Sequence, residues 1–195
     1  VNLAARALLA TIATFVFFEI LPHFPVGVSE VHFILGSTLF LILGVAPAAF
    51  GLAAGLLIQG LFFASIDLPQ YFMNLTSLLV PLFALSLIAK AAIAPKTAYV
   101  DLSYRQALML STSYQAGVVG WVAFWVFYGQ GFGAETFASV GLFGMAYMSV
   151  IILEPLVDLA ALALAKMMRD TPASGLIQQR VYSCLLYTSP SPRDA

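Results

Sequence analysis

The sequence predicts an all-α, polytopic membrane protein with about six transmembrane helices. Hydrophobic residues make up 62% of the chain and charged residues only 9%, far below the roughly 25% charged residues of soluble domains. Apolar runs close to the ~20 residues that a transmembrane helix needs recur along the chain. These runs do not alternate between apolar and polar residues, which excludes a β-barrel. We expect one transmembrane domain over residues 1–183.

The first three crossings are predicted at residues 4–21, 31–43 and 48–64. Pro22 and Pro25 end the first crossing, because a proline disfavours helix in the residue before it. The second crossing stops near Gly44. Its 13 or so residues cover roughly 20 Å of a hydrocarbon core about 30 Å thick. Either its helix begins earlier, or the preceding segment enters the membrane as non-helical backbone enclosed by protein.

The last three crossings are predicted at residues 71–92, 107–128 and 136–168. They are separated by the loops SIDLPQ (65–70), APKTAYVDLSYRQ (94–106) and GQGFGAE (129–135). The last crossing is too long for one straight span. We therefore expect helix tilt, a kink at Pro155, or a helix end outside the bilayer.

The few charged residues fix the orientation of these crossings. If the N-terminal side of the first crossing is cytoplasmic, the following cations all fall on the cytoplasmic side: Arg6, Lys90, Lys96, Arg105, Lys166 and Arg169. The other side carries Glu19, Glu30, Asp67 and Glu135 and no Lys or Arg. This segregation agrees with the positive-inside rule. It places the segment that contains both histidines on the outer side.

Both ends of the chain are unusual. The chain begins at Val1 and enters an apolar run at once, so we expect native residues upstream, including a seventh, N-terminal helix. The segment CLLYTSPSPRD (184–194) is abruptly polar and resembles the translation of a sequencing-library adaptor. We therefore expect residues 184–195 to be a non-native, disordered tail; the alternative is a disordered cytoplasmic tail.

Several function classes are excluded by the sequence. A net charge of −1 gives no indication of nucleic-acid binding, and the single cysteine excludes an internal disulfide. The sequence contains no phosphate-binding P-loop, no nucleophile elbow and no HExxH motif. We predict that the chain is not an enzyme, so that any ATP hydrolysis it depends on takes place on separate subunits.

The outer segment FFEILPHFPVGVSEVHF (17–33) gathers both histidines of the chain with two glutamates. A neutral imidazole is the commonest protein ligand for late first-row metals, so His32 is a candidate metal ligand. The alternative for His32 and for His23 is an ordinary loop histidine at the interface. Glu30 could attract cations or orient His32, or it could simply be a solvated carboxylate.

Two amides lie near the same outer boundary. Gln59 is late in the third crossing and Asn74 is early in the fourth. Both could line the site of His32, or both could form hydrogen bonds between helices.

Two carboxylates lie inside the last crossing. Glu154 and Asp158 are four residues apart and therefore on one helix face. Intramembrane carboxylates are costly and usually functional. These two could line an ion path, contact a partner subunit, or cap backbone freed by Pro155.

Residues 31–81 resemble the CbiM family, the substrate-binding membrane component of energy-coupling-factor (ECF) importers for cobalt and nickel. The resemblance rests on His32 at the start of the second crossing, Gln59 27 residues later (59 − 32), and Asn74 15 residues after that (74 − 59). The stretch NLTS matches an N-x-x-S context, and LEP (153–155) resembles a glutamate motif of the last helix.

The resemblance implies capture of Co²⁺ or Ni²⁺ at a nearly planar nitrogen site, with no tightly bound cofactor. In the family a Met-His start supplies most ligands and a loop histidine, here His32, supplies the last. The implied partners are a transmembrane coupling protein, two cytoplasmic ATPases and a small accessory membrane subunit. The implied location is the bacterial or archaeal cytoplasmic membrane, with the 90–106 loop towards the coupling protein. Without the Met-His start, the chain from Val1 is expected to bind metal poorly.

The sequence departs from the family pattern at two places. Phe33-Ile34-Leu35 replaces a run of small residues after the histidine, and Ser65 stands where a further histidine is common. Two rival functions remain open: an ECF substrate-binding component for an organic substrate such as a vitamin, and a non-transport membrane assembly protein.

Overall fold

The computed structural model describes residues 3–94 and 97–167. Its elements are α1 (Leu3–Phe15), the π-helix η1 (Val16–Ile20), β1 (Phe24–Val26), β2 (Ser29–Val31), α2 (Gly36–Leu43), α3 (Val45–Phe62), the 3₁₀ helix η2 (Ser65–Gln70), α4 (Tyr71–Ala92), the 3₁₀ helix η3 (Tyr99–Asp101), α5 (Tyr104–Gln130) and α6 (Ala134–Met167). The predicted tail, Lys96 and Arg169 lie outside the described residues.

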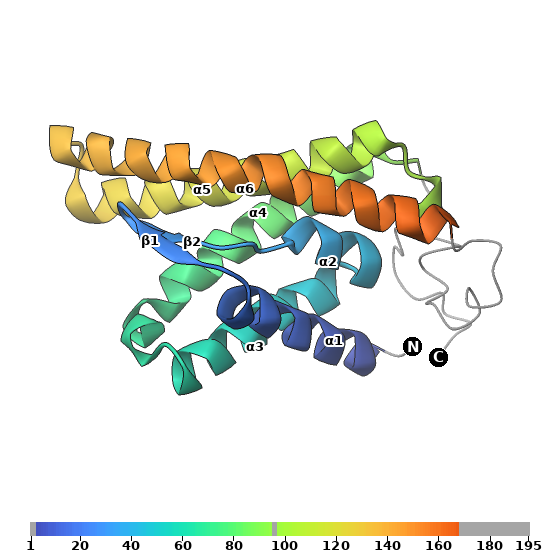
Figure 1. Ribbon diagram of the computed structural model, residues 1–195, viewed down its shortest axis with the longest axis horizontal. Helices are drawn as coiled ribbons and strands as arrows, with labels where there is room; N and C mark the ends of the chain where they lie inside the picture. The colour runs from blue at the N-terminus through green and yellow to red at the C-terminus, as the bar shows by residue number, and fades with distance from the viewer. Residues whose placement is uncertain (1–2, 95–96, 168–195) are drawn as a thin grey trace.

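The helices form a bundle with two distinct ends (Figure 1). The start of α1, the connection between α4 and α5, and the end of α6 lie at one end. The β1–β2 hairpin and the turns that join α3 to α4 and α5 to α6 lie at the other. Lys90 and Lys166 occupy the last turns of α4 and α6, and Asp67 lies in η2. The predicted separation of cations from acids therefore follows the two ends of the bundle.

Four helical segments are long and apolar enough to cross a membrane: Leu3–Ile20, Val45–Phe62, Ser65–Ala92 and Ala134–Met167. The chain is thus a multi-pass membrane protein by composition, but the predicted count of about six spans is not confirmed. α6 is one 34-residue helix that continues through Pro155.

The two remaining predicted crossings differ from expectation for separate reasons. α2 has only eight residues, which cover about 12 Å, so residues 31–43 do not form a spanning helix. α5 has 27 residues but is less apolar, because it carries the buried polar residues Ser111, Tyr114 and Gln115. These side chains face other polar groups inside the bundle, as described below.

Candidate functional site

A short hairpin brings His32 to the interior of the bundle. The π-helix η1 ends at Leu21, whose backbone N–H bonds to the Val16 carbonyl at 3.0 Å. β1 and β2 then pair antiparallel, with Val26 opposite Ser29. Gly27 in the turn has φ +62, and a Cβ there would lie 2.6 Å from the Ser139 carbonyl oxygen of α6. Only glycine fits this turn so close to α6, and His32 follows directly after β2.

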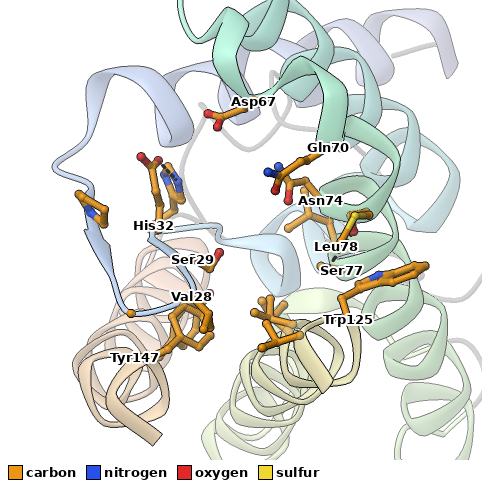
Figure 2. Close-up of a pocket in the computed structure, with 18 of the residues that line it drawn as sticks. Val28, Ser29, His32, Asp67, Gln70, Asn74, Ser77, Leu78, Trp125 and Tyr147 are labelled. Carbon is orange, nitrogen blue, oxygen red and sulfur yellow. Dashed lines mark hydrogen bonds and ion pairs between the residues drawn. The ribbon is translucent and has the colours of Figure 1, made fainter. Parts of the chain in front are cut away.

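A cavity of about 660 Å³ opens beside His32 and is lined by the hairpin and by α3, α4, α5 and α6. We call it the outer cavity. Figure 2 shows His32 on one wall, with Asp67, Gln70 and Asn74 on the side formed by η2 and α4. Trp125 and Tyr147 lie lower, on α5 and α6. The lining is therefore mixed, with amides, carboxylates and aromatic rings around one histidine.

The His32 ring is held on three sides. It packs against Phe18 at 4.8 Å between ring centroids and stacks on His23 at 5.1 Å. Its Nε2 lies 3.0 Å from Glu30 Oε2. Its Nδ1 is buried and has no hydrogen-bond partner among the described residues.

Electrostatics keep this imidazole neutral. Burial and, to a smaller extent, the nearby His23 lower the pKa of His32 from 6.5 to about 4. The contact with the partly exposed Glu30 is therefore a hydrogen bond from a neutral ring rather than an ion pair. The tautomer that fits both nitrogens donates from Nε2 to Glu30 and leaves the Nδ1 lone pair available. An imidazole in this state is ready to bind a metal ion.

The predicted site residues fall into two groups. Glu30, His32, Gln59 and Asn74 all line the outer cavity. Their roles as ligands or orienting groups stay predictions. Over residues 3–94 and 97–167, no three or more His, Cys, Asp or Glu side chains converge in a way that could hold a metal ion. A multidentate site at His32 therefore needs donors other than these.

Glu154 and Asp158 form the second group, and neither lines the outer cavity. Both are buried, at 0% and 1% exposure. Glu154 accepts hydrogen bonds from the backbone N–H groups of Ile34 and Leu35 and from Gln115 Nε2. Asp158 accepts from the hydroxyls of Ser37 and Thr38. We call these carboxylates and their donors the carboxylate cluster.

The cluster answers one of the open questions from the sequence. Most partners of the two carboxylates lie at or just before the start of α2, about 120 residues away in the chain, and Gln115 comes from α5. Among the described contacts, none joins these side chains to backbone near Pro155, so a cap at the proline, one of the three alternatives, is not seen there. The prediction that both lie on one face of the helix is confirmed, since both point to α2.

Sequence reasoning missed several residues of the outer cavity, including Asp67, Gln70, Ser29 and Trp125. Asp67 and Gln70 were assigned only to a loop. A signal was present, because a six-residue connection between crossings that carry Gln59 and Asn74 must lie close to both. Trp125 and Tyr147 line the outer cavity because of the way the helices pack, and no sequence pattern indicated their position.

A family model described as "Cobalt uptake substrate-specific transmembrane region" matches residues 2–171 of the chain. No curated protein and no solved structure matches the chain significantly.

Proposed function

Because the chain belongs to the CbiM family, a family of membrane components for cobalt uptake and not of enzymes, we propose that it captures Co²⁺ or Ni²⁺ for an ECF importer. The ion would bind from the outside of a bacterial or archaeal cytoplasmic membrane. A transmembrane coupling protein and two cytoplasmic ATPases, with a small accessory membrane subunit, would then drive its release inside. The segment at residues 90–106 would contact the coupling protein.

One observation carries this proposal: His32 presents a buried, unpaired Nδ1 on a neutral ring beside a cavity. A buried nitrogen without a partner costs free energy unless a ligand satisfies it. Imidazole nitrogen suits Co²⁺ and Ni²⁺ and disfavours Mg²⁺ and Ca²⁺. Glu30 would hold the ring through Nε2, as carboxylates commonly do for metal-binding histidines.

The remaining ligands are assigned by family likeness. The resemblance places them on a Met-His start that enters the site from outside, and residues 1–195 contain no Met-His pair. A volume of about 660 Å³ exceeds what an ion needs, and we propose that the Met-His segment occupies the rest.

Calorimetry with Co²⁺ and Ni²⁺ on the protein produced from its complete coding sequence tests the proposal. We expect His32→Ala to weaken binding by more than about 100-fold, because second-shell changes alone cost about 10–100-fold. His23→Ala is the matched control, since the His23 ring stacks on His32 but is exposed and its Nδ1 is 3.1 Å from the Leu21 carbonyl. Unchanged affinity in His32→Ala would refute the assignment.

The size and aromatic lining of the outer cavity favour a second candidate, an organic substrate such as a vitamin. A volume of about 660 Å³ is within the range of small-molecule sites, and Phe18, Trp125 and Tyr147 supply apolar surface. The two candidates differ in their dependence on the histidine. An organic substrate would lose affinity in Trp125→Ala and would still bind to protein treated with a metal chelator.

A further inference from the structure

The backbone segment that follows His32 is hydrogen-bonded to one side chain, that of Glu154. Ile34 and Leu35 come two and three residues after the histidine, and both donate their backbone N–H to the Glu154 carboxylate. The Leu35 nitrogen lies 3.2 Å from Oε2. Since Glu154 is fully buried, water cannot replace it as the acceptor.

The backbone needs this support because its conformation is unfavourable. Leu35 caps the start of α2 with φ 49 and ψ 32, the left-handed region, and it is the only non-glycine residue with positive φ in the described part of the chain. Such a conformation is unfavourable for a residue with a Cβ and persists only where the surroundings fix it. The Leu35 side chain makes no hydrogen bond to the start of α2. Glu154 therefore fixes the turn that joins the histidine to α2.

The two carboxylates of the cluster differ in the kind of donor that they meet. The Asp158 partners are hydroxyls, with Ser37 Oγ at 2.5 Å from Oδ2, and a hydroxyl can rotate to accept instead of donate. The Glu154 partners are two backbone amides and the Gln115 side-chain amide. Backbone amides can only donate, so they require an acceptor at residue 154.

We propose that Glu154 is a positioning residue for His32. By accepting from Ile34 and Leu35 it fixes the backbone so that the imidazole stacks between Phe18 and His23 and donates from Nε2 to Glu30. Its effect on ion capture rests on the proposed function, whereas its effect on the ring does not.

The test uses ¹⁵N-histidine labelling of the complete protein in detergent micelles without metal. The 195 residues contain two histidines, and His32→Gln identifies the ring signals of His32 by removing them from the spectrum. In the wild type we expect His32 to show a protonated Nε2 and an unprotonated Nδ1. Glu154→Gln should shift or broaden the His32 signals, because the amide keeps one acceptor oxygen but presents an N–H group to the donors that meet the other carboxylate oxygen. Asp158→Asn is the matched control and should leave these signals in place.

A swap separates positioning from the mere presence of a buried charge. Glu154→Gln combined with Gln115→Glu keeps one carboxylate and a hydrogen bond between residues 154 and 115, but it leaves a single amide oxygen, in place of two carboxylate oxygens, to accept from the two loop amides. We expect no recovery of the His32 signals in the swap. Recovery, or unchanged signals in Glu154→Gln, would overturn the proposal. If Glu154→Gln does not fold, Glu154→Asp serves, and unchanged His32 signals there would equally overturn it.

Calorimetry with Co²⁺ forms the second arm. We expect Glu154→Gln to lower the affinity by at least ~10-fold and Asp158→Asn by less than ~3-fold. Equal losses in the two variants would contradict positioning by Glu154. If the wild type binds neither Co²⁺ nor Ni²⁺, the proposed function fails, while the metal-free ring signals still decide the role of Glu154.

Discussion

The outer cavity and the carboxylate cluster contain many of the buried polar side chains, and they are built in opposite ways. In the cluster, both carboxylates accept at least two hydrogen bonds each, and neither lines the outer cavity. His32 lines the outer cavity, and its buried Nδ1 has no partner within the described residues. The difference teaches that buried polar groups of this bundle are either satisfied by one another, as in the cluster, or left without a partner, as at the histidine where we propose that a ligand binds.

A short path of side-chain hydrogen bonds connects the two regions, in addition to the contact of Ile34 with Glu154. Tyr147 lines the outer cavity and donates to Gln115 Oε1 at 3.2 Å, and Gln115 donates in turn to Glu154. Substitutions in the carboxylate cluster should therefore also disturb the outer cavity, whereas substitutions in the outer cavity should have little effect on the cluster. The following predictions test this asymmetry through the free energy of unfolding.

The largest effect is expected from Glu154→Met, which fills the space but removes the acceptor. Two buried backbone N–H groups would lose their partner, at about 1–3 kcal/mol each, so we expect a loss of about 3 kcal/mol or more. Denaturant titration in detergent micelles measures it. Leu153→Met, at an exposed neighbouring position of α6, should change stability by less than about 0.5 kcal/mol. Equal effects of the two variants would show that the cluster is not needed for the fold.

A comparable effect should follow acidification, because His32 titrates near 4 when folded and near 6.5 when unfolded. Between these values the unfolded chain binds more protons, so stability falls as the pH is lowered. From pH 7 to below 4 this histidine should cost about 3 kcal/mol. Thermal unfolding of wild type and His32→Gln at pH 7 and pH 4 measures the difference. A pH dependence of the same size in His32→Gln would argue against a buried neutral ring.

A smaller loss is expected from Gly36→Ala at the start of α2. The added Cβ would lie 2.3 Å from Cζ of Tyr114, a ring that is itself fully buried. Overpacking of this kind costs about 1–3 kcal/mol. Gly141→Ala is the control, because a Cβ there meets nothing within 4 Å. If thermal unfolding shows no loss in Gly36→Ala, the contact between α2 and α5 is looser than described.

The smallest effect on stability is expected inside the outer cavity. Asn74→Ala should change the free energy of unfolding by no more than about 0.5 kcal/mol, while Co²⁺ binding falls by about 10-fold if the amide orients a ligand. Denaturant titration and calorimetry on one preparation give both values. A loss of stability above about 1 kcal/mol would show that Asn74 stabilises the fold, as the carboxylate cluster does.

Much of the fold was predictable because a membrane helix is visible in the sequence as an apolar run of about the same length. The predicted crossing 71–92 has the bounds of α4, and the crossing 107–128 lies within α5. The predicted crossing 31–43 is not confirmed as a spanning helix, because the eight-residue α2 follows a non-helical segment there, and an apolar run does not reveal so short a helix. The hairpin at Phe24–Val31 was read as a loop, since two three-residue strands give no periodicity.

The candidate site was predictable only in part. The sequence indicates His32, Glu30, Gln59 and Asn74 as candidates, and all four line one cavity. The partners of Glu154 could not be predicted, because two of its three donors are backbone N–H groups. Every residue except proline carries such a group, so no sequence pattern marks which ones a distant carboxylate will find.

The π-helical turn at Val16–Ile20 makes the contact with His32 depend on the number of residues in this segment. A π turn accommodates one residue more than an α turn, and here Phe18 within it rests on His32. A chain shorter by one residue at this point would run as ordinary α-helix into the same hairpin, and a different side chain would meet the ring. The loss of a single codon in this turn would thus change the surface against which the histidine rests.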